Sequence, residues 1–110
     1  MTKPVDIDLP GDDRRIVWQI LRANLPPKAK VWVFGSRATG RAQRYSDLDL
    51  AIDAGRAMTL DETASLAEAF SESDLAYRVD VVDWHAIEDR FRRIIARERV
   101  KLTEGAASST

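Results

Sequence analysis

The stretch GSRATGRAQRYSDLDLAID, residues 35–53, decides the fold that we expect for this chain. From residue 47 onward it alternates acidic and apolar residues, which is the period of a β-strand with one face toward a core. Its first half is polar and holds two glycines, so it predicts a loop that can include a short helical turn. The apolar face of the strand would fix its register against the core and consists of Leu48, Leu50 and Ile52.

Two elements are predicted before this stretch. Residues 30–34, KVWVF, are rich in β-branched and aromatic side chains and predict a buried strand that ends at Gly35. A helix is expected between Pro10-Gly11 and Pro26-Pro27. Residues 1–9 are expected to form an arm. The apolar residues of the helix recur at helical spacing and are Ile16, Val17, Ile20, Leu21 and Leu25.

Three elements are predicted after it. Thr59 and Glu62 have the spacing of a capping box, which opens a helix that should fade by Ser73. Residues 77–82, YRVDVV, predict a third strand, and Asp83 is a plausible cap for a last helix that runs to about Arg99. The first of these helices is expected to bury Leu60, Leu66, Ala67 and Phe70. The inward stripe of the last helix is expected to be Trp84, Ile87, Phe91, Ile94 and Ile95.

This order of elements favours the α/β (α+β) class. A small mixed sheet of three to four strands, with helices packed mainly on one face, would bury the apolar stripes. At 110 residues the chain is long enough for one such domain, which we expect over residues 1–104, followed by a disordered tail at 105–110.

Composition excludes several classes of function. The net charge of −1 argues against a domain that binds nucleic acid directly through bulk electrostatics. The chain has no cysteine, so disulfides and thiolate metal sites are excluded. No apolar run approaches the roughly 20 residues that span a membrane, and we therefore expect a cytoplasmic protein.

Three acidic residues suggest metal chemistry. Asp47 and Asp49 lie two apart on one predicted strand, so their carboxylates point to the same side. Asp80 lies centrally on another strand, and it completes a cluster if the two strands are neighbours. Like charges on one face repel unless something neutralises them, and hard divalent cations do this with oxygen ligands. Two such ions can stabilise both the attacking and the leaving oxygen of a displacement.

A possible phosphate site lies at the end of the first strand. Glycine at position 35 would let the backbone approach a ligand closely, and the following amides with the Ser36 hydroxyl could donate to phosphate oxygens. Arg37, Arg41 and Arg44 in the same loop could add charge-assisted hydrogen bonds.

Together these residues resemble a known family. A Gly-Ser followed after ten residues by Asp-x-Asp resembles the signature of the DNA polymerase β-like nucleotidyltransferases, and the short length with the later RVDVVD looks like their smallest, MNT-type branch. The resemblance covers roughly residues 12–102. It implies the fold of that family, with the triphosphate of ATP on Gly35 and Ser36, and two Mg²⁺ ions on Asp47, Asp49 and Asp80.

The resemblance also implies a reaction and a partner. MNT-type domains are commonly paired with a HEPN-type toxin and act as antitoxins that transfer AMP to one of its tyrosines, which allows a hetero-oligomer. Two other functions remain open: an antitoxin that neutralises its partner by docking alone, and, less expected, transfer to a small molecule such as an antibiotic. The family gives the pairing, and no residue of this chain shows it.

The remaining polar residues favour structural interpretations. His85 is expected to be a surface or capping residue, Asp53 to be solvated, and Tyr45 to be a packed loop aromatic rather than a base-stacking one. Arg78 should share a strand face with Asp80 and either pair with an acid or touch the nucleotide. The arginines of the last helix are interleaved with acids and indicate a solvated face, with docking of an acidic partner as the alternative.

Overall fold

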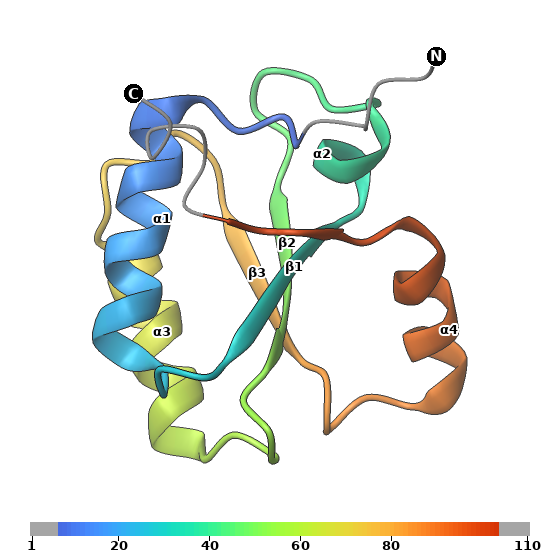
Figure 1. The fold of residues 1–110 in the computed structure, drawn as a ribbon. Helices are drawn as coiled ribbons and strands as arrows, with labels where there is room; N and C mark the ends of the chain where they lie inside the picture. The colour runs from blue at the N-terminus through green and yellow to red at the C-terminus, as the bar shows by residue number, and fades with distance from the viewer. Residues whose placement is uncertain (1–6, 104–110) are drawn as a thin grey trace.

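The computed structural model describes residues 7–103 as four helices and four strands. A four-stranded sheet forms the centre of the molecule (Figure 1). In chain order the elements are α1 (Gly11–Asn24), β1 (Lys30–Phe34), α2 (Ser36–Thr39), β2 (Leu48–Asp53), α3 (Leu60–Ser71), β3 (Val79–Asp83), α4 (Asp89–Glu98) and β4 (Val100–Lys101).

The sheet is mixed and has the strand order β3-β2-β1-β4. Strand β1 is antiparallel to both β2 and β4, whereas β2 and β3 are parallel and are joined through α3. A crossover helix is the usual way to connect parallel neighbours. The predicted class and the predicted three to four strands are confirmed. The two-residue strand β4 was not predicted.

One face of the sheet carries the main core, beneath α1 and α3 (Figure 1). The alternation in β2 is confirmed, because Leu48, Leu50 and Ile52 are fully buried on this face. Val17 and Leu21 of α1 and Leu66 and Phe70 of α3 pack against them. The register of β2 is thereby fixed, and its acidic residues must point to the other face.

The other face is partly covered by α4. A smaller cluster of Phe34, Ala51 and Ile95 is buried there, with half-buried Trp32 and Trp84 packed against it. The two indole rings lie 5.7 Å apart, and the Arg99 guanidinium lies over both. The expectation of helices mainly on one face therefore holds for α1 and α3, while α4 is the exception.

Two expected helices differ from the structure. The capping box at Thr59 is present, but Leu60 is 88% exposed and Ala67 is exposed, because the buried side of α3 runs through Leu66 and Phe70. The last helix starts only at Asp89.

Asp83 is not its cap. Asp83 ends β3, and its carboxylate accepts the amides of Met58 and His85. The expected inward stripe of α4 is partly wrong too. Ile95 is buried, whereas Phe91 and Ile94 are 37% and 47% exposed, since α4 covers only one edge of its face.

The first residues of the described part of the chain pack against the core. Residues 7–9 form neither helix nor strand, as expected of an arm, but Ile7 and Leu9 are buried in the main core. The rest of the arm and the predicted tail at 105–110 lie outside the described residues. Among the helices that the structure describes, none is both long enough and apolar enough to cross a membrane.

Candidate active site

Three acids gather where β2 and β3 begin. Asp49 and Asp80 are register partners across the parallel pair, so both side chains lie on the α4 face. Asp47 precedes β2 by one residue instead of lying in the strand as expected. One nitrogen of Arg78, Nη2, contacts Oδ2 of Asp47 at 3.4 Å and Oδ2 of Asp80 at 3.3 Å. The structure thus brings the three predicted acids together, with Arg78 pairing to two of them.

Asp49 has the most perturbed carboxyl of this cluster. Burial, followed by the negative charges of Asp80, Asp47 and Glu98, raises the pKa of Asp49 to about 6, although Arg78 acts in the opposite direction. A carboxyl that is half-buried among other carboxyls resists ionisation, because its negative charge lacks full compensation. The cluster therefore favours any ligand that brings positive charge to Asp49.

The donor set suits a hard divalent cation. Carboxylate oxygens are the ligands that Mg²⁺ takes in proteins. Among residues 7–103, no three carboxylate or imidazole groups are arranged to hold a metal ion as they stand. The side chains of Asp47 and Asp80 are 43% and 42% exposed and turn toward Arg78 instead. Metal binding at these residues would require Arg78 to release them.

The Gly35-Ser36 turn lies directly against Asp49. Gly35 has a φ of 74°, and a Cβ at this position would overlap the carboxylate of Asp49. Only glycine permits both this conformation and this approach. Its carbonyl accepts the amides of Ala38 and Thr39 in the one-turn helix α2. The predicted phosphate turn and the predicted metal acids are therefore neighbours.

The Arg37 side chain points away from this turn. It is only 3% exposed, and it donates to the carbonyls of Asp8, Arg44 and Ser46. Its guanidinium also lies 3.9 Å from the centre of the Tyr77 ring. Because these backbone groups hold the guanidinium, we assign the Arg37 side chain to the fold and leave it out of the phosphate site.

The other loop residues are at the surface. Arg41 donates to the Thr39 hydroxyl, and Arg44 lies over the ring of Tyr45 at 5.2 Å. Tyr45 is 62% exposed, so its expected packing in the loop is wrong.

Glu98 is a residue of this region that the sequence analysis did not find. It ends α4, and its Oε1 accepts the Gly35 amide at 2.8 Å. Its charge is also one of those acting on Asp49. The sequence offered no signal for it, because its neighbours are the arginines of an ordinary-looking basic helix.

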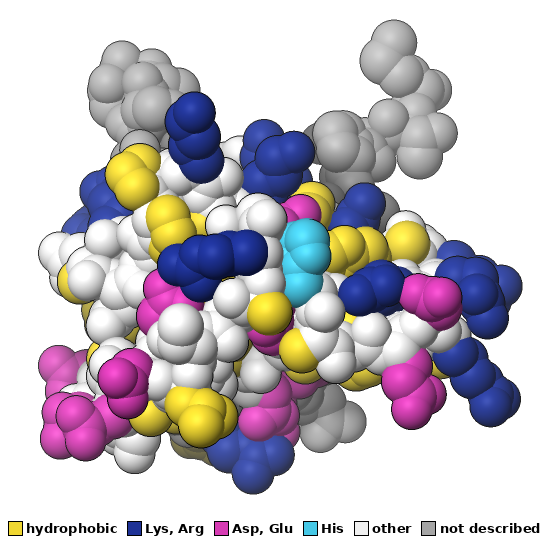
Figure 2. Space-filling view, turned by 90° about the horizontal axis from the view of Figure 1, so that it is seen from below, with side chains coloured by type: hydrophobic (Ala, Val, Ile, Leu, Met, Phe, Trp, Pro, Cys, Tyr) yellow, Lys and Arg dark blue, Asp and Glu magenta, His cyan; other side chains and the backbone are white. Residues whose placement is uncertain are grey.

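The far end of β2 carries a different pair. Nε2 of His85 lies 2.6 Å from Oδ1 of Asp53, which contradicts the expectation that Asp53 is simply solvated. Burial raises the pKa of Asp53, but the Gly55 amide and His85 outweigh it and hold this pKa below its usual range. Figure 2 looks onto the surface with His85, and basic and acidic side chains lie interleaved on its α4 side, as expected for a solvated face.

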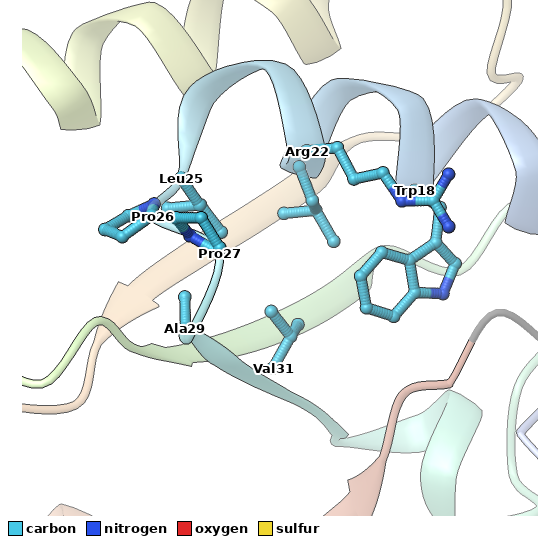
Figure 3. A pocket seen from close by; sticks show the side chains of 8 residues that line it. Trp18, Arg22, Leu25, Pro26, Pro27, Ala29 and Val31 are labelled. Carbon is cyan, nitrogen blue, oxygen red and sulfur yellow. The ribbon is translucent and has the colours of Figure 1, made fainter.

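An apolar pocket lies away from the acids, between α1 and β1 (Figure 3). Its lining contains no carboxylate, so it offers nothing to a cation. The residues that line it are Trp18, Leu21, Arg22, Leu25, Pro26, Pro27, Ala29 and Val31.

Comparison with known proteins shows the family of this chain. Residues 17–106 match the family model described as polymerase beta, nucleotidyltransferase. The chain belongs to this family. It is 43% identical over 104 residues to a Haemophilus influenzae protein named "Probable protein adenylyltransferase MntA". The aligned residues cover 94% of this chain and 90% of that relative.

Solved structures share the fold. A crystal structure of a toxin-antitoxin with AMP-PNP matches with a TM-score of 0.71 at 24% identity, over 87% of this chain and 77% of the other. A structure of the tri-AMPylated Shewanella oneidensis HEPN toxin with its MNT antitoxin matches with a TM-score of 0.61 at 22% identity, over 87% and 73% of the two chains. At these identities the likeness supports the fold.

Proposed function

We propose that this nucleotidyltransferase transfers AMP from ATP to a hydroxyl group of a HEPN-type toxin and is the antitoxin of that pair. The observation that carries the proposal is the approach of Asp49, partnered by Asp80, to the Gly35-Ser36 turn. Carboxylates beside a phosphate-binding turn are what nucleotidyl transfer needs. The Haemophilus relative has the name of a protein adenylyltransferase, which supports a protein as acceptor.

The phosphates of ATP would lie on the turn. The Gly35 carbonyl accepts the amides of Ala38 and Thr39, whereas those of Ser36 and Arg37 open α2 ahead of its first helical hydrogen bond. Together with the Ser36 hydroxyl, these two amides can donate to phosphate oxygens. Asp47, Asp49 and Asp80 would hold two Mg²⁺ ions. When bound, these ions would neutralise the phosphates and acidify the acceptor hydroxyl.

Asp80 is the acid that we assign to the acceptor. Its carboxylate is half-exposed and lies at the outer strand of the sheet, where an acceptor can approach. It would take the proton of the acceptor hydroxyl while the oxygen forms a bond to the α-phosphorus. The bond from that phosphorus to the β-γ pyrophosphate then breaks, so AMP is transferred and pyrophosphate leaves.

The partner is proposed from the relatives. The solved neighbours include an AMP-PNP complex of a toxin-antitoxin and an AMPylated HEPN toxin with its MNT antitoxin. We propose that this chain likewise forms a hetero-oligomer with a HEPN-type protein, and that it acts in the cytoplasm.

The test is transfer of label from α-labelled ATP to a co-expressed HEPN-type protein, with Mg²⁺ present. Mass spectrometry of the acceptor should report additions of AMP on a tyrosine. An Asp47→Ala, Asp49→Ala double variant should leave the acceptor unlabelled and the toxin active. If the double variant neutralises the toxin as well as the wild type does, docking alone is the function. Labelling of an aminoglycoside in place of the protein would favour the small-molecule alternative.

A further inference from the structure

Strand β4 is very short, yet it fixes the position of one side chain. It pairs antiparallel with β1 through Trp32 opposite Lys101 and Val33 opposite Val100. Continued by two residues, this register places residue 98 opposite residue 35. Figure 1 shows α4 running directly into β4 beside β1. The ladder thus delivers the last residue of α4, Glu98, to the glycine turn.

The Gly35 amide lies between two hydrogen-bonding systems. The ladder between β1 and β2 ends one residue earlier, where Phe34 is paired with Asp49. The helical bonds of α2 begin with the Gly35 carbonyl, not with its amide. The acceptor that the structure provides for this amide is Oε1 of Glu98, at 2.8 Å in a half-buried position. A backbone amide in such a place needs a partner, and a carboxylate is a strong one.

As a glycine, residue 35 has no side chain that restricts its backbone conformation. Glycine reaches a φ of 74° without penalty, but it also reaches many other conformations. A rotation at Gly35 would turn α2 and its opening amides away from Asp49. The Glu98 bond opposes this rotation from one side of the glycine, while the bonds of α2 oppose it from the other.

We propose that Glu98 is a positioning residue for the nucleotide. By holding the Gly35 amide it keeps the Gly35-Ser36 turn directed at the acidic cluster, so that phosphates and carboxylates meet. This role rests on the proposed function, since it assumes that ATP binds at this turn. It requires a hydrogen-bond acceptor at the position of Oε1 and does not require a negative charge, because the loss expected on its removal is that of leaving the half-buried Gly35 amide without an acceptor.

The experiment compares three substitutions of Glu98 by the Kd of AMP-PNP with Mg²⁺, measured by calorimetry on the full chain. Glu98→Ala removes the acceptor, and Glu98→Asp keeps the charge but withdraws it by one methylene. Both should weaken binding about 10-fold or more, the usual effect of leaving a buried backbone donor without its acceptor. Glu98→Gln retains an acceptor oxygen and should stay within about threefold of the wild type. Arg97→Ala, exposed on the same helix, is the matched control and should bind as the wild type does.

Three results would overturn the positioning role of Glu98. Wild-type affinity in Glu98→Ala or Glu98→Asp would overturn it. A Glu98→Gln variant as weak as Glu98→Asp would overturn it too, because the charge would then be what matters. If Glu98→Ala fails to fold, the Asp and Gln variants still decide. Failure of the wild type itself to bind AMP-PNP would overturn the proposed function, and this inference with it.

Discussion

The two faces of the sheet have opposite chemistry. The face beneath α1 and α3 is apolar along the whole of β2, where Leu48, Leu50 and Ile52 are fully buried. The α4 face of the same strand carries Asp49, Ala51 and Asp53, of which Ala51 is fully buried and the two acids are half-buried. One strand therefore serves the core with one set of alternate residues and the candidate site with the other. Stability and activity should be separable by substitutions on opposite faces.

The largest expected effect is on activity at the acidic face. Asp49→Asn should lower the rate of AMP transfer by about 10³-fold or more, because metal stabilisation of the transition state is worth several kcal/mol. The measurement is transfer from α-labelled ATP. Asp53→Asn is the matched control, since it changes an acid on the same face of the same strand, but at the end paired with His85. It should remain active.

Undiminished labelling by Asp49→Asn would exclude the assigned site. A comparable loss in Asp53→Asn would mean that the whole face responds to charge, so the comparison between the two ends of β2 would fail.

Among the described residues, Arg37 is a charged residue that is buried, and its substitution gives the next largest effect. Arg37→Met should lower the free energy of unfolding by about 3 kcal/mol, because it removes a buried guanidinium that donates to three part-buried carbonyls. Arg41→Met, at an exposed position in the same loop, should change it by less than about 0.5 kcal/mol. Urea unfolding of both variants checks this. Equal stabilities would return Arg37 to the candidate phosphate ligands.

Two glycines with positive φ, Gly35 and Gly55, allow a matched test of the glycine turn. Gly35→Ala should cost about 2 to 3 kcal/mol of stability and abolish ATP binding, since its methyl group overlaps Asp49. Gly55→Ala has a φ of 83° but open space around the new methyl group, so it should cost only about 1 kcal/mol and bind ATP normally. Thermal unfolding and calorimetry separate the two. Normal ATP affinity in Gly35→Ala would mean that the close approach to Asp49 is dispensable.

The sequence predicts the acidic face well for a physical reason. Alternation in residues 47–53 fixes which side chains share a face, and a strand-helix-strand order makes β2 and β3 parallel neighbours. Together these rules bring Asp49 and Asp80 side by side without any knowledge of distances.

The sequence fails where tertiary contacts decide. An arginine in a polar loop looks like a phosphate ligand, and nothing in its neighbours reveals that Arg37 is buried among carbonyls. Glu98 depends on a two-residue strand that has no detectable period. Leu60 looks like a core residue by type, but its position on α3 directs it to solvent.

The smallest effect concerns pH and the metal-free protein. The pKa of Asp49 is about 6 in the folded chain and 3.8 as a model value, so between these values the folded state holds more of this proton than the unfolded state does. Its contribution to stability therefore falls as pH rises from about 4 to about 6, and then stays constant. We expect about 1 kcal/mol after allowance for solvent screening.

Other carboxyls act in the opposite direction, so a single curve does not isolate Asp49. The pKa of Glu62 is lowered to about 2, by its hydrogen bond to Arg56 and by that to the Thr59 amide, so its contribution to stability grows as pH rises from about 2 to its model value of 4.5 and is constant above that. The difference between Asp49→Asn and the wild type cancels such shared terms. Measured with EDTA, the variant should gain stability relative to the wild type from pH 4 to 6. Added Mg²⁺ at pH 7 should reverse the order, because the cation compensates the charge that the variant lacks. Parallel pH curves of variant and wild type would mean that the neighbouring charges do not raise the pKa of Asp49. No effect of Mg²⁺ on the stability of the wild type would mean that Asp49 does not bind the metal.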